Sequence, residues 1–515
     1  MEGVAFGAVV VLLSYFFRYP ALLNADATNS DAAVVGLQAM HILRGEHMLH
    51  LWGSGYQTSV DSYVAAAFFK VLAATPLALM LSSLTMHVVL TLGVYFLGCR
   101  FMKPRFAFLA ALPLILTASV VHSYALYPPR QTALTLGILA FVVLESETRK
   151  KAFLAALLGL LAAFADPYAL LFLPVLAMHL VLVGQDAGRT LRTVVDAVFG
   201  ALLGGIPLLV LRFHSKTVPQ PTSLELSRVF KNFGLLLDPC LSWVLGLRNY
   251  VAKDMMDYAP WDGSPWQKAL SISGTVSLLV LLVVSARAIR DPRISPRAAR
   301  LGLVGVVLMA ETLVAFLFSV MVMDHFSMRY LVGFILGIPF ALMPILFVVS
   351  RTFVDRTFVW MRLGKSEPAV WPALVVAALI LCFSISEGVS GWVGFGPFVD
   401  GVTPRRLASA DNPELLLTAL RREHVRDAIA DYWAAYRLEF IYAEEPFVVP
   451  TNPEQDRNAA QRARVLAAKR YAFIVDRQRS YDAPIELLES QLEAEGTIEK
   501  RVDYGTLTAF IVRRL

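Results

Sequence analysis

The chain has 515 residues, of which 57% are hydrophobic and 17% charged, and its formal net charge is +6. A soluble domain is nearer about 45–50% apolar and about 25% charged, so the composition excludes an ordinary soluble globular protein. Repeated apolar runs of roughly twenty residues instead predict a polytopic α-helical membrane protein. The three cysteines are too widely spaced to indicate a disulfide framework or a metal site.

The apolar runs predict about eleven transmembrane helices. They fall at residues 4–23, 77–99, 106–121, 131–145, 152–165, 168–184, 193–212, 268–286, 301–322, 330–350 and 371–390. The first run lacks a basic start and a convincing cleavage site, so we interpret it as a retained helix rather than a signal peptide.

The basic residues are distributed unevenly over the connections between these helices. One alternating set carries Arg100, Lys103, Arg105, Arg149, Lys150, Lys151, Arg189, Arg192, Arg287, Arg290, Arg293, Arg297, Arg300, Arg351, Arg356, Arg362 and Lys365. The positive-inside rule places this set and the N-terminus in the cytoplasm of a multi-pass protein of the inner (plasma) membrane. The same asymmetry explains the positive net charge without a nucleic-acid partner.

This orientation predicts three outward segments. The first two are external loops at residues 24–76 and 213–267, within a membrane domain that spans residues 1–390. The third is the tail, 391–515, whose mixed helical and β-branched patterns predict a small extracytoplasmic α/β domain. A helix ending at Gly496 and a hairpin around Gly505 are expected near its end.

Asp31 is the leading catalytic candidate. It stands at the start of "DAAVVGLQAMHILRG", whose apolar spacing predicts an amphipathic helix in the membrane interface. A carboxylate there can serve as a general base for a hydroxyl or amine acceptor. The alternative is an N-cap, because Asn29, Ser30 and Asp31 are all good capping residues.

Other outward residues suit the binding of a polar ligand. Tyr56, Gln57 and Asp61 follow a glycine-rich turn in "WGSGYQTSVDSYVAAAFF", where Asp61 is a second acidic candidate or a helix cap. Asp166, before Pro167, is interpreted as part of a turn. Glu311 falls near the middle of a predicted span, where a carboxylate is expensive and often functional.

Three outward arginines are candidates for a phosphate or diphosphate, since a guanidinium binds such groups bidentately. They are Arg44, Arg130 and Arg329, with Tyr330 beside the last. Snorkelling, or a salt bridge such as Arg329 with Asp324, is the alternative for each. We expect the acidic loop and these arginines to converge on one cavity.

The segments "NSDAAVVGLQAMHILRGE" and "LWGSGYQTSVDSYVAAAFF" resemble the first external loop of the GT-C superfamily of membrane glycosyltransferases. The similar group comprises bacterial relatives of protein O-mannosyltransferases and of lipid A aminoarabinose and galacturonic acid transferases. "FADPYALLFLPVLA", "RYLVGFILGIPFALMPIL" and "DYWAAYRLEFIYAEEPFVVP" are also similar to later segments of that group. The motifs are short, and together they extend over most of the chain.

The resemblance implies a GT-C fold and transfer of a sugar from a polyprenyl-phosphate donor to a glycan, lipid or protein acceptor. It implies that Asp31 is the base, Asp61 the second acid of the loop, and Arg329-Tyr330 a pair near the lipid phosphate. Ala32 replaces the expected Glu, and "VHSYALYPPRQT" lacks a carboxylate often present there. These departures weigh against a divalent metal, and we assign no cofactor.

Two other functions remain open from the sequence. A transporter or flippase for lipid-linked glycans would use charged groups at the membrane midplane, for which Glu311 is the candidate. A catalytically inactive scaffold, whose tail binds a partner, is the second alternative, and the replacement by Ala32 leaves it open.

Overall fold

The computed structural model of the chain describes residues 1–116, 125–186, 188–214, 223–245, 247, 249–252, 258–261, 264–292, 294–356, 370–393, 399–400, 403–404, 413–477 and 485–514. The chain divides into two compact units. The first comprises Met1–Tyr19, Leu84–Leu126 and Arg130–Val402, and the second Pro20–Ser83, Tyr127–Pro129 and Thr403–Leu515. The first predicted external loop therefore packs with the C-terminal segment. The predicted boundary after residue 390 stays a prediction.

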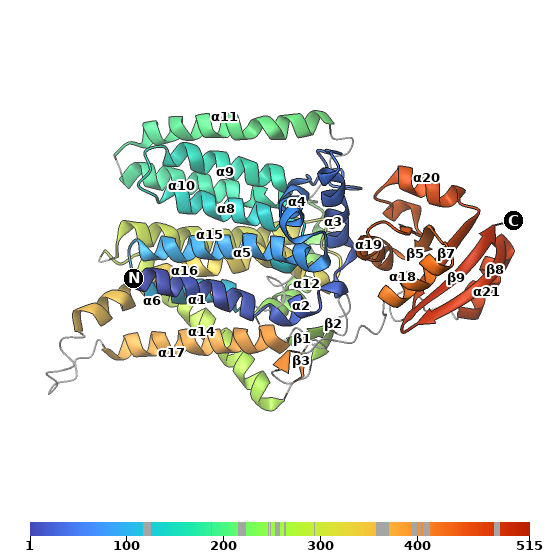
Figure 1. Ribbon diagram of the computed structural model, residues 1–515. Helices are drawn as coiled ribbons and strands as arrows, with labels where there is room; N and C mark the ends of the chain where they lie inside the picture. The colour runs from blue at the N-terminus through green and yellow to red at the C-terminus, as the bar shows by residue number, and fades with distance from the viewer. Residues whose placement is uncertain are drawn as a thin grey trace. The chain divides into compact units, whose positions relative to one another are not determined.

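The first unit is mostly helical (Figure 1). Its elements are α1 (Glu2–Phe16), α5 (Pro76–Cys99, which begins in the second unit), α6 (Pro104–Ile115), α8 (Gln131–Leu144), α9 (Lys151–Ala165), η2 (Pro167–Leu171), α10 (Phe172–Asp186), α11 (Thr190–His214), α12 (Leu226–Leu235), η3 (Leu236–Leu241), α13 (Ser242–Val244), β1 (Asn249–Ala252), β2 (Tyr258–Trp261), α14 (Pro265–Ile289), α15 (Pro296–Phe318), η4 (His325–Leu331), α16 (Val332–Arg356), α17 (Val370–Val393) and β3 (Val399–Asp400).

Within the described residues, seven helices are long and apolar enough to cross a membrane. They are Pro76–Cys99, Pro167–Asp186, Thr190–His214, Pro265–Ile289, Pro296–Phe318, His325–Arg351 and Leu374–Trp392. Four shorter apolar helices, α1, α6, α8 and α9, coincide with the remaining predicted runs. A polytopic helical protein is thus confirmed, whereas the count of eleven transmembrane helices stays a prediction. Most of the predicted loop 213–267 is described, and it contains α12, η3, α13 and the antiparallel pair β1–β2.

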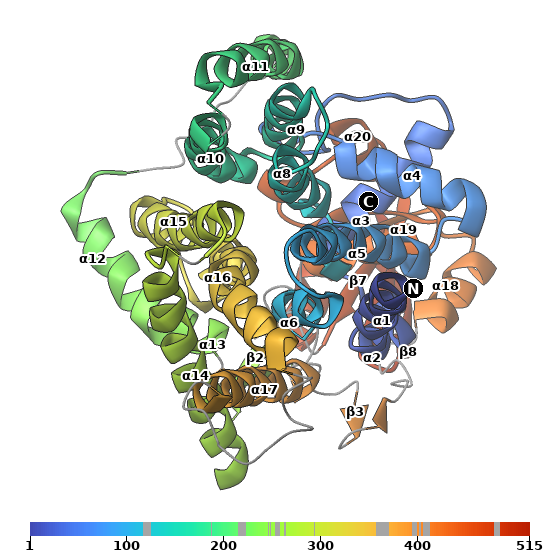
Figure 2. The same cartoon turned by 90° about the vertical axis from the view of Figure 1, so that its left-hand side faces the viewer.

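Small residues and capping residues set the packing and the ends of these helices. A Cβ atom on Gly200 of α11 would lie 2.1 Å from the carbonyl oxygen of Phe153 in α9, so only glycine allows this close approach. The pair α9–α11 and the pair α15–α16 each run side by side (Figure 2). Ser295 starts α15, because its hydroxyl accepts the Ala298 N–H at 3.2 Å and Pro296 occupies the first helical position.

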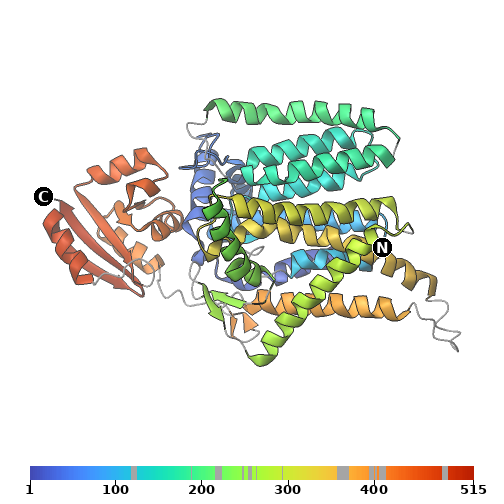
Figure 3. The ribbon, with the colours of Figure 1, turned by 180° about the vertical axis from the view of Figure 1, so that it is seen from behind.

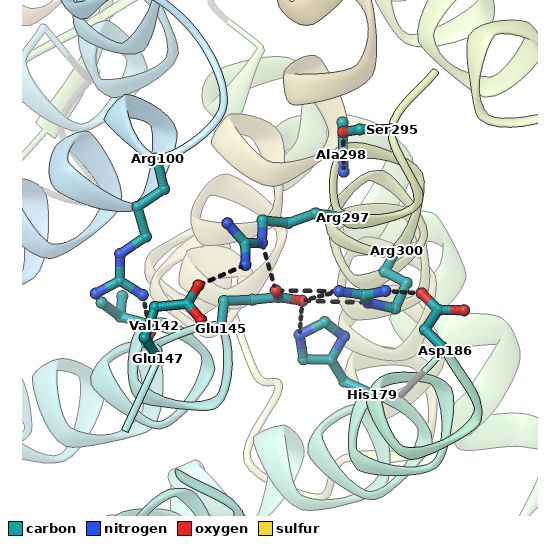
Figure 4. Close-up of polar contacts among 10 residues, drawn as sticks. All are labelled: Arg100, Val142, Glu145, Glu147, His179, Asp186, Ser295, Arg297, Ala298 and Arg300. Atoms are coloured by element: carbon teal, nitrogen blue, oxygen red, sulfur yellow. Dashed lines mark hydrogen bonds and ion pairs between the residues drawn. The ribbon is translucent and has the colours of Figure 1, made fainter. Parts of the chain in front are cut away.

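A buried ion-pair network joins the ends of three helices, α8, α10 and α15 (Figure 4). Glu145, directly after α8, is 1% exposed and accepts hydrogen bonds from Arg297 Nε and Arg300 Nη2, both at 3.0 Å. His179 of α10 lies 3.2 Å from the same carboxylate. Arg300 also pairs with Asp186 at the end of α10. One buried carboxylate thus ties the ends of α8 and α10 to the start of α15.

Replacing Glu145 by Gln is expected to destabilise the protein by about 2–3 kcal/mol, because two arginines lose a buried counter-charge. The partial exposure of both guanidinium groups keeps the loss below that of a fully buried pair. The control is Glu147→Gln, since Glu147 is 88% exposed but also pairs with Arg297, at 3.1 Å. Thermal unfolding in detergent should separate the two variants, and equal midpoints would contradict the assignment.

The second unit combines helices of the first predicted loop with a C-terminal sheet and its helices. Its elements are α2 (Tyr19–Leu23), η1 (Ala25–Ala27), α3 (Ser30–Leu43), α4 (Val60–Leu72), β4 (Thr403–Pro404), α18 (Pro413–Arg422), β5 (Asp427–Ala430), α19 (Tyr432–Ile441), β6 (Phe447–Pro450), η7 (Pro453–Gln455), α20 (Ala459–Ala467), β7 (Arg470–Asp476), α21 (Ile485–Glu495), β8 (Gly496–Tyr504) and β9 (Leu507–Arg514).

The five-stranded sheet, seen in orange to red in Figure 3, has the strand order β6-β5-β7-β9-β8. β5 pairs in parallel with β6 and β7, whereas β9 pairs antiparallel with β7 and β8. Alternate residues of β7 and β9 face opposite sides. Ala472 and Ile511 pack in a cluster that contains residues of α18 and α19, and Tyr471 and Phe510 pack with residues of α21. The expected hairpin is confirmed, with Gly505 at φ +58°.

Helix α3 is confirmed as a helix, but it is not a surface helix with one buried stripe. Eleven of its fourteen residues are buried. The reason is that α4 and α19 both pack against it, so side chains outside the predicted stripe, such as Gln38, are also covered. A Cβ atom on Gly36 would lie 2.7 Å from the ring of Phe440, so α19 approaches α3 closely.

Candidate active site

Asp31 is the second residue of α3 and does not cap it. The N-cap is Asn29, whose side chain accepts the Ala32 N–H at 2.8 Å. The Asp31 side chain is 43% exposed. Its Oδ1 accepts a hydrogen bond from the Tyr432 hydroxyl and lies 3.7 Å from Arg457 Nη2. The capping interpretation is therefore wrong for Asp31, and its carboxylate is accessible and held by one hydrogen bond and one ion pair.

Tyr432 and Arg457 were not identified from the sequence. Tyr432 is the first residue of α19, and Arg457 precedes α20. Burial and then the charge of Asp31 raise the pKa of Tyr432, so the phenol stays protonated and donates. The segment "DYWAAYRLEF" carries part of the family resemblance, but no local pattern indicates that its tyrosine contacts residue 31.

The second acidic candidate, Asp61, is buried at the second position of α4. It is not the N-cap residue either, because Ser59 occupies that position. In the turn before α4, Gln57 is buried and its backbone N–H donates to the Ser54 hydroxyl at 3.1 Å, while Tyr56 is half-buried. These contacts shape the loop, and the ligand-binding roles of Tyr56, Gln57 and Asp61 stay predictions.

Arg44 at the end of α3 pairs with Glu444, which follows α19 and is 5% exposed on its side chain. His41 Nε2 lies 2.5 Å from the same carboxylate, and His41 Nδ1 lies 2.6 Å from Glu46. A buried carboxylate thus accounts for the Arg44 guanidinium, and the predicted phosphate-binding role of Arg44 is less favoured than for the other two arginines.

The pair His41–Glu444 predicts a pH-dependent stability. The hydrogen bond to Glu444 raises the pKa of His41. Burial of Glu444 alone would raise the pKa of its carboxyl group, but the hydrogen bonds and charges of His41 and Arg44 outweigh it, and this pKa is lowered. The histidine contribution is present below its unfolded pKa of about 6.5 and is lost as the pH rises through the raised value. The Glu444 contribution is lost only as the pH falls through its lowered value.

Unfolding midpoints measured between about pH 6 and about pH 8.5 should therefore fall less for His41→Gln than for the unmodified protein. Over this pH range, the loss in free energy of unfolding is expected to differ between the two proteins by about 0.5–1 kcal/mol. His47→Gln is the control, because His47 is exposed and stacks on Tyr63. If both variants keep the original pH dependence, the pair does not contribute.

Arg130, Arg329 and Tyr330 come together in the first unit. Arg130 Nε donates to Asp166 Oδ2 at 3.2 Å, and its guanidinium lies 6.0 Å from the centre of the Tyr330 ring. The Arg329 guanidinium lies 5.1 Å from the same ring, and Arg329 is exposed. Tyr168 fixes the position of Tyr330, because its hydroxyl donates to the Tyr330 carbonyl oxygen at 2.9 Å.

Arg130 also has an unusual backbone conformation, with φ at +114°, which L residues rarely adopt. Its partner Asp166, interpreted from the sequence as part of a turn, is buried and caps η2 through the Tyr168 N–H at 2.8 Å. Two guanidinium groups thus lie within 6.0 Å of the centre of one tyrosine ring, and this arrangement can bind an anion such as a phosphate.

No family model and no curated protein matches the chain. Solved structures do. ArnT from Cupriavidus metallidurans in the apo state is similar with a TM-score of 0.57 at 10% identity, over 99% of this chain and 97% of that chain. The same protein bound to undecaprenyl phosphate gives 0.58 at 12% identity, with the same coverage. The Archaeoglobus fulgidus oligosaccharyltransferase in the apo form gives 0.52 at 11% identity, over 92% and 70%.

The chain has the GT-C fold. The resemblance detected in the sequence motifs is thereby confirmed at the level of the fold. At 10–12% identity the likeness to ArnT carries no residue-by-residue information, so the roles of the side chains rest on their own geometry.

Proposed function

We propose that the chain is an integral membrane glycosyltransferase. It moves a sugar from a polyprenyl-phosphate donor to a cell-envelope glycan, lipid or protein acceptor at the outer face of the membrane. The observation that carries the proposal is the accessible Asp31 carboxylate, which caps no helix and is held by Tyr432 and Arg457. The GT-C fold, shared with an ArnT solved with undecaprenyl phosphate, supports the class of donor.

In the proposed reaction, Asp31 accepts the proton of the acceptor hydroxyl or amine. The acceptor oxygen or nitrogen forms a bond to the anomeric carbon of the sugar. The bond between that carbon and the phosphate oxygen breaks, and its electron pair leaves with polyprenyl phosphate. The phosphate is itself the leaving group, so no nucleotide is needed, and the attack inverts the anomeric configuration.

The pair of guanidinium groups at Tyr330 is proposed to bind the lipid phosphate. Arg329 is exposed and stacks on the ring, whereas Arg130 is held by Asp166. Positive charge next to the leaving phosphate would stabilise the charge that develops as the glycosidic bond breaks. The basic connections support an orientation with the N-terminus in the cytoplasm and residues 391–515 outside it.

Mass spectrometry of lipids that copurify with the protein tests the class of donor. We expect a polyprenyl-phosphate sugar or the product polyprenyl phosphate, and its mass would identify the sugar. Copurification of ordinary phospholipids alone, together with no sugar transfer in vesicles supplied with polyprenyl-phosphate sugars, would contradict the proposal.

A flippase is the second candidate, because Glu311 places a half-buried carboxylate inside α15. Glu311→Gln distinguishes the two functions. A glycosyltransferase with Asp31 as its base keeps its sugar transfer in this variant. A flippase loses lipid translocation and shows no transfer in either form.

A further inference from the structure

We propose that Tyr432 and Arg457 are positioning residues for Asp31, so that the C-terminal segment completes the catalytic site. This inference rests on the proposed function, in which Asp31 is the base. Among the described residues, both contacts of the carboxylate involve Oδ1: the Tyr432 hydroxyl donates to it, and Arg457 Nη2 lies 3.7 Å away. Oδ2 is then the oxygen that accepts the proton of the acceptor.

Tyr432 is fixed by the contact between α19 and α3. The Ser30 hydroxyl lies 2.6 Å from the Tyr432 carbonyl oxygen and 2.9 Å from that of Trp433. Arg437, one turn further along α19, is buried and donates from Nε to the Asp26 carbonyl oxygen at 3.0 Å. These bonds hold the start of α19 against the residue that precedes Asp31, so they set the place of the Tyr432 hydroxyl without involving it.

Arg457 is fixed from three sides. Its backbone N–H donates to the Tyr436 hydroxyl at 2.6 Å, its Nη1 to the Gly53 carbonyl oxygen at 2.9 Å, and its Nη2 to the Tyr432 hydroxyl at 2.9 Å. The guanidinium also lies 5.3 Å from the centre of the Tyr432 ring. A surface ion pair has no such support, so this guanidinium is preorganised beside the carboxylate.

The chemical consequence concerns orientation. A carboxylate that is 43% exposed at a helix start would otherwise rotate freely and exchange its partners with water. The Tyr432 hydrogen bond and the Arg457 ion pair, both at Oδ1, restrict that rotation and keep Oδ2 in one direction. Misplacement of a reacting group by about 1 Å can cost a factor of about 100 in rate. Tyr432 and Arg457 should therefore affect turnover rather than binding of the lipid donor.

Tyr432→Phe and Arg457→Gln test the inference in full-length protein assayed in vesicles with a polyprenyl-phosphate sugar. We expect each to lower kcat by about 10- to 100-fold, with KM for the donor within about twofold and an unchanged unfolding midpoint. Arg457→Lys keeps the charge and should restore part of the loss. Arg462→Gln is the matched control, because Arg462 donates to the Pro450 carbonyl oxygen at 2.7 Å and should leave kcat unchanged.

Gly53→Ala provides an independent route to the same result. Gly53 has φ at +63°, and a Cβ atom there would lie 2.2 Å from Arg457 Cδ and 2.9 Å from its Cα. The substitution should displace Arg457 and lower kcat as Arg457→Gln does, within about threefold.

The double variant Asp31→Asn with Tyr432→Phe separates positioning from a general structural effect. Without the base there is nothing left to position, so the double variant should be no slower than Asp31→Asn alone. Original kcat values in Tyr432→Phe and Arg457→Gln, or losses that multiply with that of Asp31→Asn, would overturn the inference and leave the proposed base intact. Full activity of Asp31→Asn would instead overturn the base, and the positioning role with it.

Discussion

Replacing Asp31 by Asn is expected to lower the turnover of sugar transfer by about 1,000-fold. General base catalysis by a positioned side chain contributes about 100- to 10,000-fold, and an amide cannot accept the acceptor proton. Asn keeps the shape of Asp, and its carbonyl oxygen can still accept the Tyr432 hydrogen bond. The fold of α3 should also persist, because Asn29 rather than Asp31 caps it. The measurement is kcat in vesicles containing a polyprenyl-phosphate sugar and the acceptor.

Glu46→Gln is the matched control for Asp31→Asn. Glu46 is an exposed acid of the same loop whose described side-chain contact is with His41, at 2.6 Å. It should keep kcat within about twofold. Asp31→Glu moves the carboxylate by one methylene and should recover part of the activity. If Asp31→Asn retains more than about a tenth of the original turnover, another group acts as the base, whatever the fold implies.

The positions of the long apolar helices were largely predictable from the sequence. Apolar runs of about twenty residues have few alternatives to a helix, so each predicted run coincides with a helix. Local signals also served well near the C-terminus. Gly496 and Gly505 correctly indicated the end of α21 and the turn between β8 and β9. These features depend on residues that are close together in sequence.

The surroundings of the candidate base could not be predicted in the same way. Asp31 and Tyr432 are separated by 401 residues, and nothing local to either indicates the contact. The same holds for Arg44 and Glu444. The helical spacing of apolar residues predicts that one face of α3 is buried, but it cannot show that α4 and α19 bury the helix on several sides.

Capping preference was a misleading signal at both acidic candidates. Asn29, Ser30 and Asp31 are all good caps, and only the backbone conformation shows that Asn29 takes the position. Asp166 shows the opposite case: its capping role in η2 fits a turn residue, but its burial against Arg130 gives it a second role. Residue type therefore located the acids, whereas their partners required the tertiary structure.

Replacing Arg329 by Gln is expected to raise KM for the polyprenyl-phosphate donor by about 10- to 100-fold. A hydrogen bond to a charged group contributes about 1.5–3 kcal/mol, and each 1.4 kcal/mol corresponds to about a factor of ten in binding. Arg329 is exposed. Its stacking contact and its hydrogen bond from Nη2 are both with Tyr330, which is half-buried. The free energy of unfolding should therefore change by less than about 0.5 kcal/mol.

Arg44→Gln separates phosphate binding from simple loss of positive charge. Arg44 pairs with the buried carboxylate of Glu444, so its loss should lower the unfolding midpoint and leave KM for the donor within about twofold. Steady-state kinetics over a range of donor concentrations, with unfolding in the same detergent, measures both effects. An equal rise of KM in both variants would show that the donor responds to net charge alone. An unchanged KM together with an unchanged kcat in Arg329→Gln would remove Arg329 from the phosphate site, because a guanidinium next to the leaving phosphate must contribute either to donor binding or to the transition state.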